Sequence, residues 1–274
     1  MSGIVADDDG LETGYRASTP DGDNALVDYA RGEADCFAAI AAAAGGRVES
    51  DETLGLRLAD TGSPSPFGNT AHLTRPIGDD ETPALAGALR DFFGAAPGGP
   101  FLLFSPWPTG NLRSRGYQLV GHPPLMLRAP TVPLPAPNPK LRISAAKTAD
   151  DLADFEQTLV EAYPVPELQP WKRETFLRPG VLGTQWRFFV GYEGDRCVAT
   201  AAAWLCDTVT IVEQVSVRDD CRGRGYGAAI TAAATHADPG PPAMLIASDL
   251  GRSIYEQLGY VPLLRYSLHL GTRA

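Results

Sequence analysis

The residues best suited to chemistry form the run Arg222-Gly223-Arg224-Gly225-Tyr226-Gly227. It follows an apolar strand-like segment (Thr208 to Val217) and precedes a small-residue helix expected over Ala228 to Ala237. Three alternating glycines at such a junction let a loop approach a ligand without side chains in the way. The amides at a helix start favour phosphate, and so do the two arginines. The run therefore predicts a pyrophosphate cradle; the alternative interpretation is a surface turn with a helix cap.

Other reactive residue types give weaker signals. Cys221 precedes the run and could be a nucleophile, although an incidental position is favoured. The cysteines show no CxxC spacing and no histidine at metal distance, so no metal site is expected. None of the histidines has a sequence partner that marks a catalytic triad; His269 is placed on the polar face of the last strand.

Length and composition set the class of protein. The chain has 274 residues, 44% of them hydrophobic, which fits two globular domains of ordinary size. The net charge of -10 argues against a nucleic-acid binder and mildly favours cationic partners such as amines. The polar start and the short apolar stretches predict a cytoplasmic protein with reduced thiols and no membrane partner.

The chain divides at a proline-rich segment. Residues 129–139 contain five prolines, which excludes helix and central strand, so 131–139 are predicted as a linker. Residues 1–23 are polar and expected to be a disordered tail. The two domains are then 24–130 and 140–274, each with helices and strands. The second has the clearer order, β-α-loop-β-β-β-α-β-α-β, which indicates an α/β (α+β) fold with a mixed central sheet flanked by helices.

The two halves are related by a spacing match. Ser105 precedes Gly116-Tyr117 by the same number of residues as Ser248 precedes Gly259-Tyr260, and an apolar strand leads into each. This favours an internal duplication. Where the second half has its glycine run, the first has Asp79-Asp80-Glu81, and acids there would repel phosphate. The first half is therefore expected to lack the phosphate site and to have a structural or substrate-shaping role.

The second half resembles the GNAT acyltransferase superfamily. Its Arg/Gln-x-x-Gly-x-Gly/Ala signature appears as the glycine-arginine run after Val215-Ser216-Val217. The later Tyr and Leu-Gly-Phe/Tyr signature appears over Tyr255 to Tyr260. Where many members have Asn before the last helix, this chain has Ser248-Asp249-Leu250-Gly251. With its degenerate first half, the chain looks like a tandem GNAT protein.

The resemblance implies acetyl-CoA, or another acyl-CoA, as co-substrate. The amides of Gly223, Arg224, Gly225, Tyr226, Gly227 and Ala228, together with Arg222, are expected to hold the pyrophosphate, and the strand edge Val215-Ser216-Val217 is expected to pair with the pantetheine. Tyr255 would protonate the leaving thiolate as general acid. The reaction expected is direct transfer of an acetyl group to a primary amine in a ternary complex, without a covalent enzyme intermediate.

The acceptor side is less defined. Glu213 lies two residues before Val215, on the same face of a regular strand, and is a candidate base or ammonium anchor. Tyr163, Glu167 and Trp171 lie in the segment where the family places its acceptor site and could bind the amine or simply cover the core. The alternative function is a CoA-binding regulatory or scaffolding protein without turnover. A monomer is plausible and a dimer possible.

Overall fold

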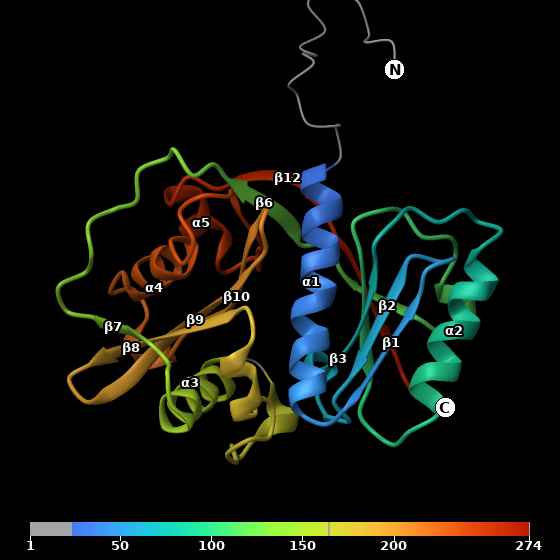
Figure 1. Ribbon diagram of the computed structural model, residues 1–274, viewed down its shortest axis with the longest axis horizontal. Coiled ribbons are helices and arrows are strands. Elements are labelled where there is room, and N and C mark those ends of the chain that lie inside the picture. The colour runs from blue at the N-terminus through green and yellow to red at the C-terminus, as the bar shows by residue number, and fades with distance from the viewer. Residues whose placement is uncertain (1–23, 164, 274) are drawn as a thin grey trace, which may run out of the picture.

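The computed structural model describes residues 24–163 and 165–273. Two sheets stand on either side of the long helix α1 (Asn24–Ala43) (Figure 1). In spatial order the first sheet holds β1 (Arg47–Asp51), β2 (Leu56–Asp60), β3 (Asn69–Leu73), β4 (Phe101–Ser105), β13 (Ser267–Gly271) and β5 (Gln118–Gly121). The second holds β7 (Arg142–Ala145), β8 (Trp186–Glu193), β9 (Arg196–Leu205), β10 (Thr210–Val217), β11 (Ala243–Ile246), β6 (Pro124–Arg128) and β12 (Val261–Arg265). The predicted α/β class, with mixed sheets flanked by helices, is confirmed.

The two sheets have the same plan. Six strands correspond in order: β1-β2-β3-β4-β13-β5 in the first sheet and β8-β9-β10-β11-β6-β12 in the second. In both orders the third pair of neighbours is parallel and the other four pairs are antiparallel. The second sheet adds β7 at its outer edge. Gly116 and Gly259 hold left-handed backbones, with φ of 90° and 87°, before the buried Tyr117 and Tyr260. This agrees with the predicted internal repeat.

Each half places its last strand in the other half's sheet. β6 pairs with β11 and β12, and β13 pairs with β4 and β5. The residues from Leu264 to Leu270 alternate between apolar and polar types as one continuous strand would, but the chain breaks at the buried Tyr266, where it passes from one sheet to the other. Beyond β13, the buried Arg273 forms a bidentate ion pair with Asp60, with N–O distances of 2.8 and 2.7 Å. The halves are thus interlocked.

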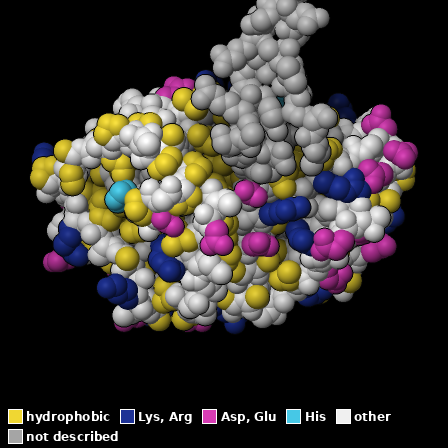
Figure 2. Space-filling view, turned by 45° about the horizontal axis from the view of Figure 1, so that its top comes forward, with side chains coloured by type: hydrophobic (Ala, Val, Ile, Leu, Met, Phe, Trp, Pro, Cys, Tyr) yellow, Lys and Arg dark blue, Asp and Glu magenta, His cyan; other side chains and the backbone are white. Residues whose placement is uncertain are grey.

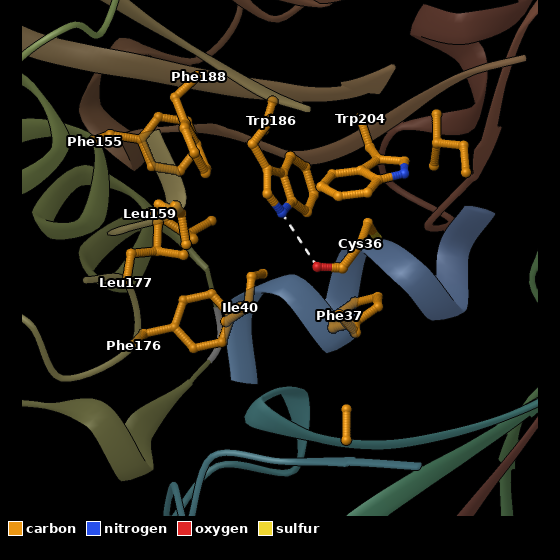
Figure 3. Packing of buried hydrophobic residues seen from close by; sticks show 14 of the residues in the cluster. Cys36, Phe37, Ile40, Phe155, Leu159, Phe176, Leu177, Trp186, Phe188 and Trp204 are labelled. Carbon is orange, nitrogen blue, oxygen red and sulfur yellow. Dashed lines mark hydrogen bonds between the residues drawn. The ribbon is translucent and has the colours of Figure 1, made fainter. Parts of the chain in front are cut away.

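Helix α1 contacts both sheets. One apolar face of the helix is buried, including Ala30, Phe37 and Ile40. A Cβ on Gly32 would lie 2.7 Å from both Cys206 Sγ and Ile211 Cδ1, so a larger residue would displace these side chains and glycine allows the close approach to β10. Figure 3 shows Trp186 above Cys36, with the Trp186 indole donating to the Cys36 carbonyl at 3.2 Å. Phe37 instead stacks on His72 of the first sheet, with ring centroids 5.3 Å apart. Helix α1 is therefore a shared core element of the two halves.

The remaining helices flank the sheets. They are α2 (Thr82–Gly94), α3 (Ala149–Ala162), α4 (Tyr226–Thr235) and α5 (Arg252–Gln257). Helix α3 begins with a capping box, because the Thr148 hydroxyl accepts from the Asp151 amide and the Asp151 carboxylate accepts from the Thr148 amide. Residues 129–139 form neither helix nor strand, as the prolines predicted.

The surface carries charges of both signs. In the view of Figure 2, acidic and basic side chains are interspersed on the right, and hydrophobic side chains gather on the left, over the second sheet. The acidic net charge is therefore not gathered into one patch on this face. No helix within residues 24–163 and 165–273 is long and apolar enough to span a membrane.

Candidate active site

A cavity of about 250 Å³ opens between the two halves of the molecule. One wall comes from α1, β4 and β13, and the other from α3, β10, β11 and α5. Its lining residues are Glu33, Phe37, Phe67, Phe104, Pro123, Leu159, Val160, Tyr163, Val165, Leu168, Phe176, Val212, Glu213, Gln214, Val215, Ile246, Ala247, Ser248, Tyr255 and Leu268. Most are apolar, so the few polar groups stand out as candidates for chemistry.

The cavity lies where two parallel strands separate. β10 and β11 pair only at Thr210–Ala243 and Ile211–Met244, and farther along both strands line the cavity instead of each other. In the first half, the equivalent pair β3–β4 continues to a third pairing, between His72 and Phe104. The opening is thus specific to the second half, and it leaves one edge of β10 without a neighbouring strand, as the pantetheine prediction requires.

A β-bulge shapes the opened strand. Gln214 has a φ of 54°, and the pairing with β9 shifts register between Glu213 and Ser216. As a result four consecutive residues, 212–215, line the cavity. The alternation that placed Glu213 and Val215 on one face does not hold through a bulge, yet both reach the cavity. The Gln214 amide oxygen and nitrogen are buried and have no hydrogen-bond partner among the described residues, so they are available to a ligand.

Two carboxylates from opposite halves share this cavity. Burial and the nearby Glu33 raise the pKa of Glu213 to about 8. Burial likewise raises the pKa of Glu33, which is 1% exposed, to about 8. Sequence reasoning missed Glu33, although an acid between Ala30, Ala34 and Phe37 in the apolar stripe of α1 was a usable signal.

Glu33 is held in place by two aromatic side chains. The Tyr29 hydroxyl donates to Oε1 at 3.3 Å, and His72 Nδ1 lies 3.3 Å from Oε2. Burial lowers the pKa of His72 to about 3, so the ring is neutral and adds no positive charge beside Glu33. The ring stacks on Phe104, with centroids 4.7 Å apart. The Glu33 carboxyl group is thus oriented, and His72 does not offset its raised pKa.

Tyr255 lies on the second-half wall. It is 7% exposed, and burial together with the Glu213 charge raises the pKa of its hydroxyl well above its ordinary value. The hydroxyl therefore stays protonated and can donate. Tyr163 also lines the cavity and packs edge-on against Phe67, with centroids 5.4 Å apart. The structure thus brings together Tyr255, Glu213 and Tyr163, three of the predicted site residues.

The two other predicted acceptor residues do not line the cavity. Glu167 is exposed at the surface. The Trp171 indole donates to the buried Glu156 carboxylate at 3.1 Å and its ring packs against the core. Their segment still contributes to the cavity through Val165, Leu168 and Phe176.

The glycine run is a tight loop entering α4. Gly223 and Gly225 have φ of 75° and 78°, which favours glycine. Within the described residues, the amides of Gly223, Arg224 and Gly225 have no hydrogen-bond partner. Gly227 lies against α5, where a Cβ would be 3.2 Å from Ile254 Cδ1, and Ala228 is partly exposed. The loop can therefore present its amides to an anion.

The side chains of the run are already engaged within the protein. Arg222 donates to the Val217 and Ala162 carbonyls and pairs with Asp219. Arg224 contacts both carboxylate oxygens of Glu193 at 3.0 Å. The Tyr226 ring is buried in the core, with its hydroxyl 2.5 Å from the same carboxylate. Backbone amides, more than arginines, are thus the groups left for phosphate.

The end of β10 leads into the glycine run. Ser216 is buried and its hydroxyl lies 2.7 Å from that of Thr200, while Val217 is partly buried and ends β10.

The first half has an acidic loop where the second half has the glycine run. In this loop Glu81 pairs with Arg75 and accepts from the Gly78 amide at 2.8 Å. That loop is closed on itself by its own carboxylate, as the acidic sequence suggested.

No group of three or more potential metal ligands gathers within the described part of the chain. The described cysteines are free, and Cys221 is 1% exposed with a thiol whose pKa burial raises. A buried protonated thiol is a poor nucleophile.

Comparison with known proteins places this geometry in a family. Residues 184–262 match the model of the acetyltransferase (GNAT) domain. No curated protein matches the sequence. Among solved structures, a GCN5-related N-acetyltransferase from Kribbella flavida is similar with a TM-score of 0.67 and 22% identity, over 90% of this chain and 95% of that one.

Two further structures support the fold. A conserved protein of unknown function from Staphylococcus epidermidis has a TM-score of 0.58 at 13% identity, over 84% of this chain and 95% of that one. A putative acetyltransferase of the GNAT family from Novosphingobium aromaticivorans has a TM-score of 0.54 at 18% identity, over 82% and 91%. The predicted resemblance is therefore confirmed: residues 184–262 match the domain of the GNAT acetyltransferases, the class that transfers acyl groups from acyl-CoA, and the chain shares its fold with these structures.

Proposed function

We propose that the protein is an N-acetyltransferase that transfers the acetyl group of acetyl-CoA to a primary amine by direct attack. The observation that carries this is the cavity at the separation of β10 and β11, which holds Glu213 and Tyr255 together. The glycine loop follows the same strand directly. A base on the opened strand β10, an acid on the neighbouring helix α5 and a phosphate-binding loop after β10 are the parts that such a transfer needs.

The residues present fit an acyl-CoA. The amides of Gly223 to Ala228 would hold the pyrophosphate, and the free edge of Val215 to Val217 would pair with the pantetheine. When bound, the thioester supplies the activated acyl carbon. A surface already hollowed, with unpartnered amides and an open strand edge, needs little rearrangement to accept an extended ligand.

Two side chains then move protons. The Glu213 carboxylate accepts a proton from the incoming ammonium, which frees the nitrogen lone pair. The nitrogen forms its bond to the acyl carbon as the carbon–sulfur bond breaks, and the Tyr255 hydroxyl donates its proton to the departing sulfur. The second proton, which the nitrogen loses as it becomes an amide, restores the Tyr255 hydroxyl. The direct route is favoured because Cys221 is buried and protonated.

The proposal is tested by following free thiol. Wild-type protein with acetyl-CoA should release thiol only when a suitable amine from a panel is added. Tyr255→Phe should slow this release roughly a hundredfold, since one proton donor is lost, while calorimetry should show unchanged CoA affinity. Binding of CoA without amine-dependent release would indicate a regulatory or scaffolding protein instead, and absence of CoA binding would reject both functions.

The cradle is tested at Gly223. A Cβ there meets nothing within 4 Å, so Gly223→Asp adds a negative charge at φ 75° without a clash. CoA affinity should fall roughly tenfold or more, because the charge repels phosphate and the backbone is strained by about 1–2 kcal/mol. Gly45→Asp is the matched control: its φ is 71°, its Cβ position is also empty, and it lies at the end of α1. Equal CoA affinity in the two variants would refute the cradle.

A further inference from the structure

Among the described residues that line the cavity, the titratable groups include two acids, Glu33 and Glu213, and no lysine, arginine or histidine. His72, which lies 3.3 Å from Glu33, is neutral because burial lowers its pKa. Burial raises the pKa of both carboxyl groups to about 8. A bound cation would stabilise their ionised forms, so such a cavity favours a positively charged ligand.

The two carboxylates come from different halves of the molecule. Glu213 lies on the bulge of β10, and Glu33 lies on α1, next to the Gly32 that packs against Ile211 of the same strand. Tyr29 and His72 fix the Glu33 carboxylate, which is 1% exposed yet reaches the cavity. Gln214 lines the same cavity, and its side-chain amide is buried without a partner among the described residues. These polar groups thus share a cavity whose described lining includes no lysine, arginine or histidine.

The rest of the wall sets the character of the ligand. Phe37 and Phe104 come from the first half, and Tyr163 and Phe176 from the second. Aromatic faces bury apolar surface and also attract cations. The volume of about 250 Å³ accommodates a small molecule. The ligand that suits both features has a compact apolar body and a single ammonium group.

We infer that the acceptor is a small primary amine with an apolar body, and that Glu33 of the first half binds its ammonium opposite Glu213. This rests on the proposed transferase function and deepens it. Glu33 holds the charged nitrogen, and Glu213 takes the proton that must leave before the nitrogen attacks. The half without a phosphate loop thereby supplies one wall and one charge of the acceptor site.

The experiment compares two probes of nearly the same shape. 2-Phenylethylamine and the neutral 2-phenylethanol are titrated by calorimetry into CoA-loaded protein. Wild type should bind the amine at least tenfold more tightly than the alcohol, and Glu33→Gln should weaken amine binding roughly tenfold or more, as expected for loss of a hydrogen bond to a charged group. Asp35→Asn is the matched control, because it removes a carboxylate from the same helix at an exposed position outside this cavity.

Two results would overturn the inference. The first is equal affinity of wild type for the amine and the alcohol, a comparison that does not depend on the folding of any variant. The second is an amine affinity in Glu33→Gln equal to that in Asp35→Asn. Thermal unfolding of each variant shows whether it is folded. The titration does not depend on turnover. Glu33-dependent amine binding without thiol release would keep the acceptor site and reject the transferase function. Thiol release with an acceptor KM that is the same in wild type and Glu33→Gln would keep the transferase function and reject the role of Glu33.

Discussion

Glu213→Gln is expected to lower kcat for amine-dependent thiol release by roughly 10²–10⁴, the usual contribution of a positioned acid or base. The amide has the shape of the carboxyl group but cannot accept the proton of the ammonium. CoA affinity should remain, since the free edge of β10 and the glycine loop are unchanged. Glu256→Gln is the control: this neighbour of Tyr255 lies at the surface and pairs with Arg252. A Glu213→Gln rate within a few fold of this control would reject Glu213 as the base.

The pH profile gives a second, independent readout. The pKa of Glu213 is about 8, so the fraction of carboxylate able to accept a proton grows as pH rises through that value. Wild-type kcat should therefore rise with pH to about 8 and then level off, and Glu213→Gln should lose this limb. Because the Glu33 charge raises the pKa of Glu213, Glu33→Gln should move the limb to lower pH. The two acids titrate as a coupled pair, so the measured values belong to the pair.

The sequence predicted those parts of the site that depend on local pattern. The glycines at 223 and 225 predicted a loop without bulky side chains at a strand-to-helix junction, and in the structure both have left-handed backbone there. Tyr255, placed by its motif, reaches the cavity together with Glu213 and Tyr163. The spacing to Gly116 and Gly259 revealed a repeat that the two sheets share in strand order.

What depends on contacts between distant segments could not be predicted. Alternation identifies the strand that contains Leu268 but not the sheet that receives it, so the exchange of β6 and β13 was missed. The exchange also explains His269: with Ser267 to Gly271 between β4 and β5, this side chain is 7% exposed, and its predicted place on a polar face was wrong. Glu33 gains its role only because α1 lies between the sheets.

The largest effect on stability is expected at Glu156. This carboxylate is 1% exposed and accepts four hydrogen bonds: from the amides of Phe176 and Leu177 on one oxygen, at 2.6 and 2.9 Å, and from the Glu174 amide and the Trp171 indole on the other, at 2.8 and 3.1 Å. It therefore organises the segment from Trp171 to Leu177, which forms neither helix nor strand, and that segment supplies Phe176 to the cavity.

Glu156→Gln replaces one acceptor oxygen by an NH₂ group that faces two N–H donors. Leaving two buried donors without partners should lower the free energy of unfolding by roughly 2–6 kcal/mol, at about 1–3 kcal/mol each. Urea unfolding measures the loss. Glu161→Gln, one turn farther along α3, breaks only a partly exposed ion pair with Arg218 and should cost at most about 1 kcal/mol. If Glu156→Gln unfolds at the same urea concentration as this control, the carboxylate does not hold the segment. If it is destabilised as expected, the KM for the amine should rise while CoA affinity is retained, because Val165, Leu168 and Phe176 line the acceptor side of the cavity.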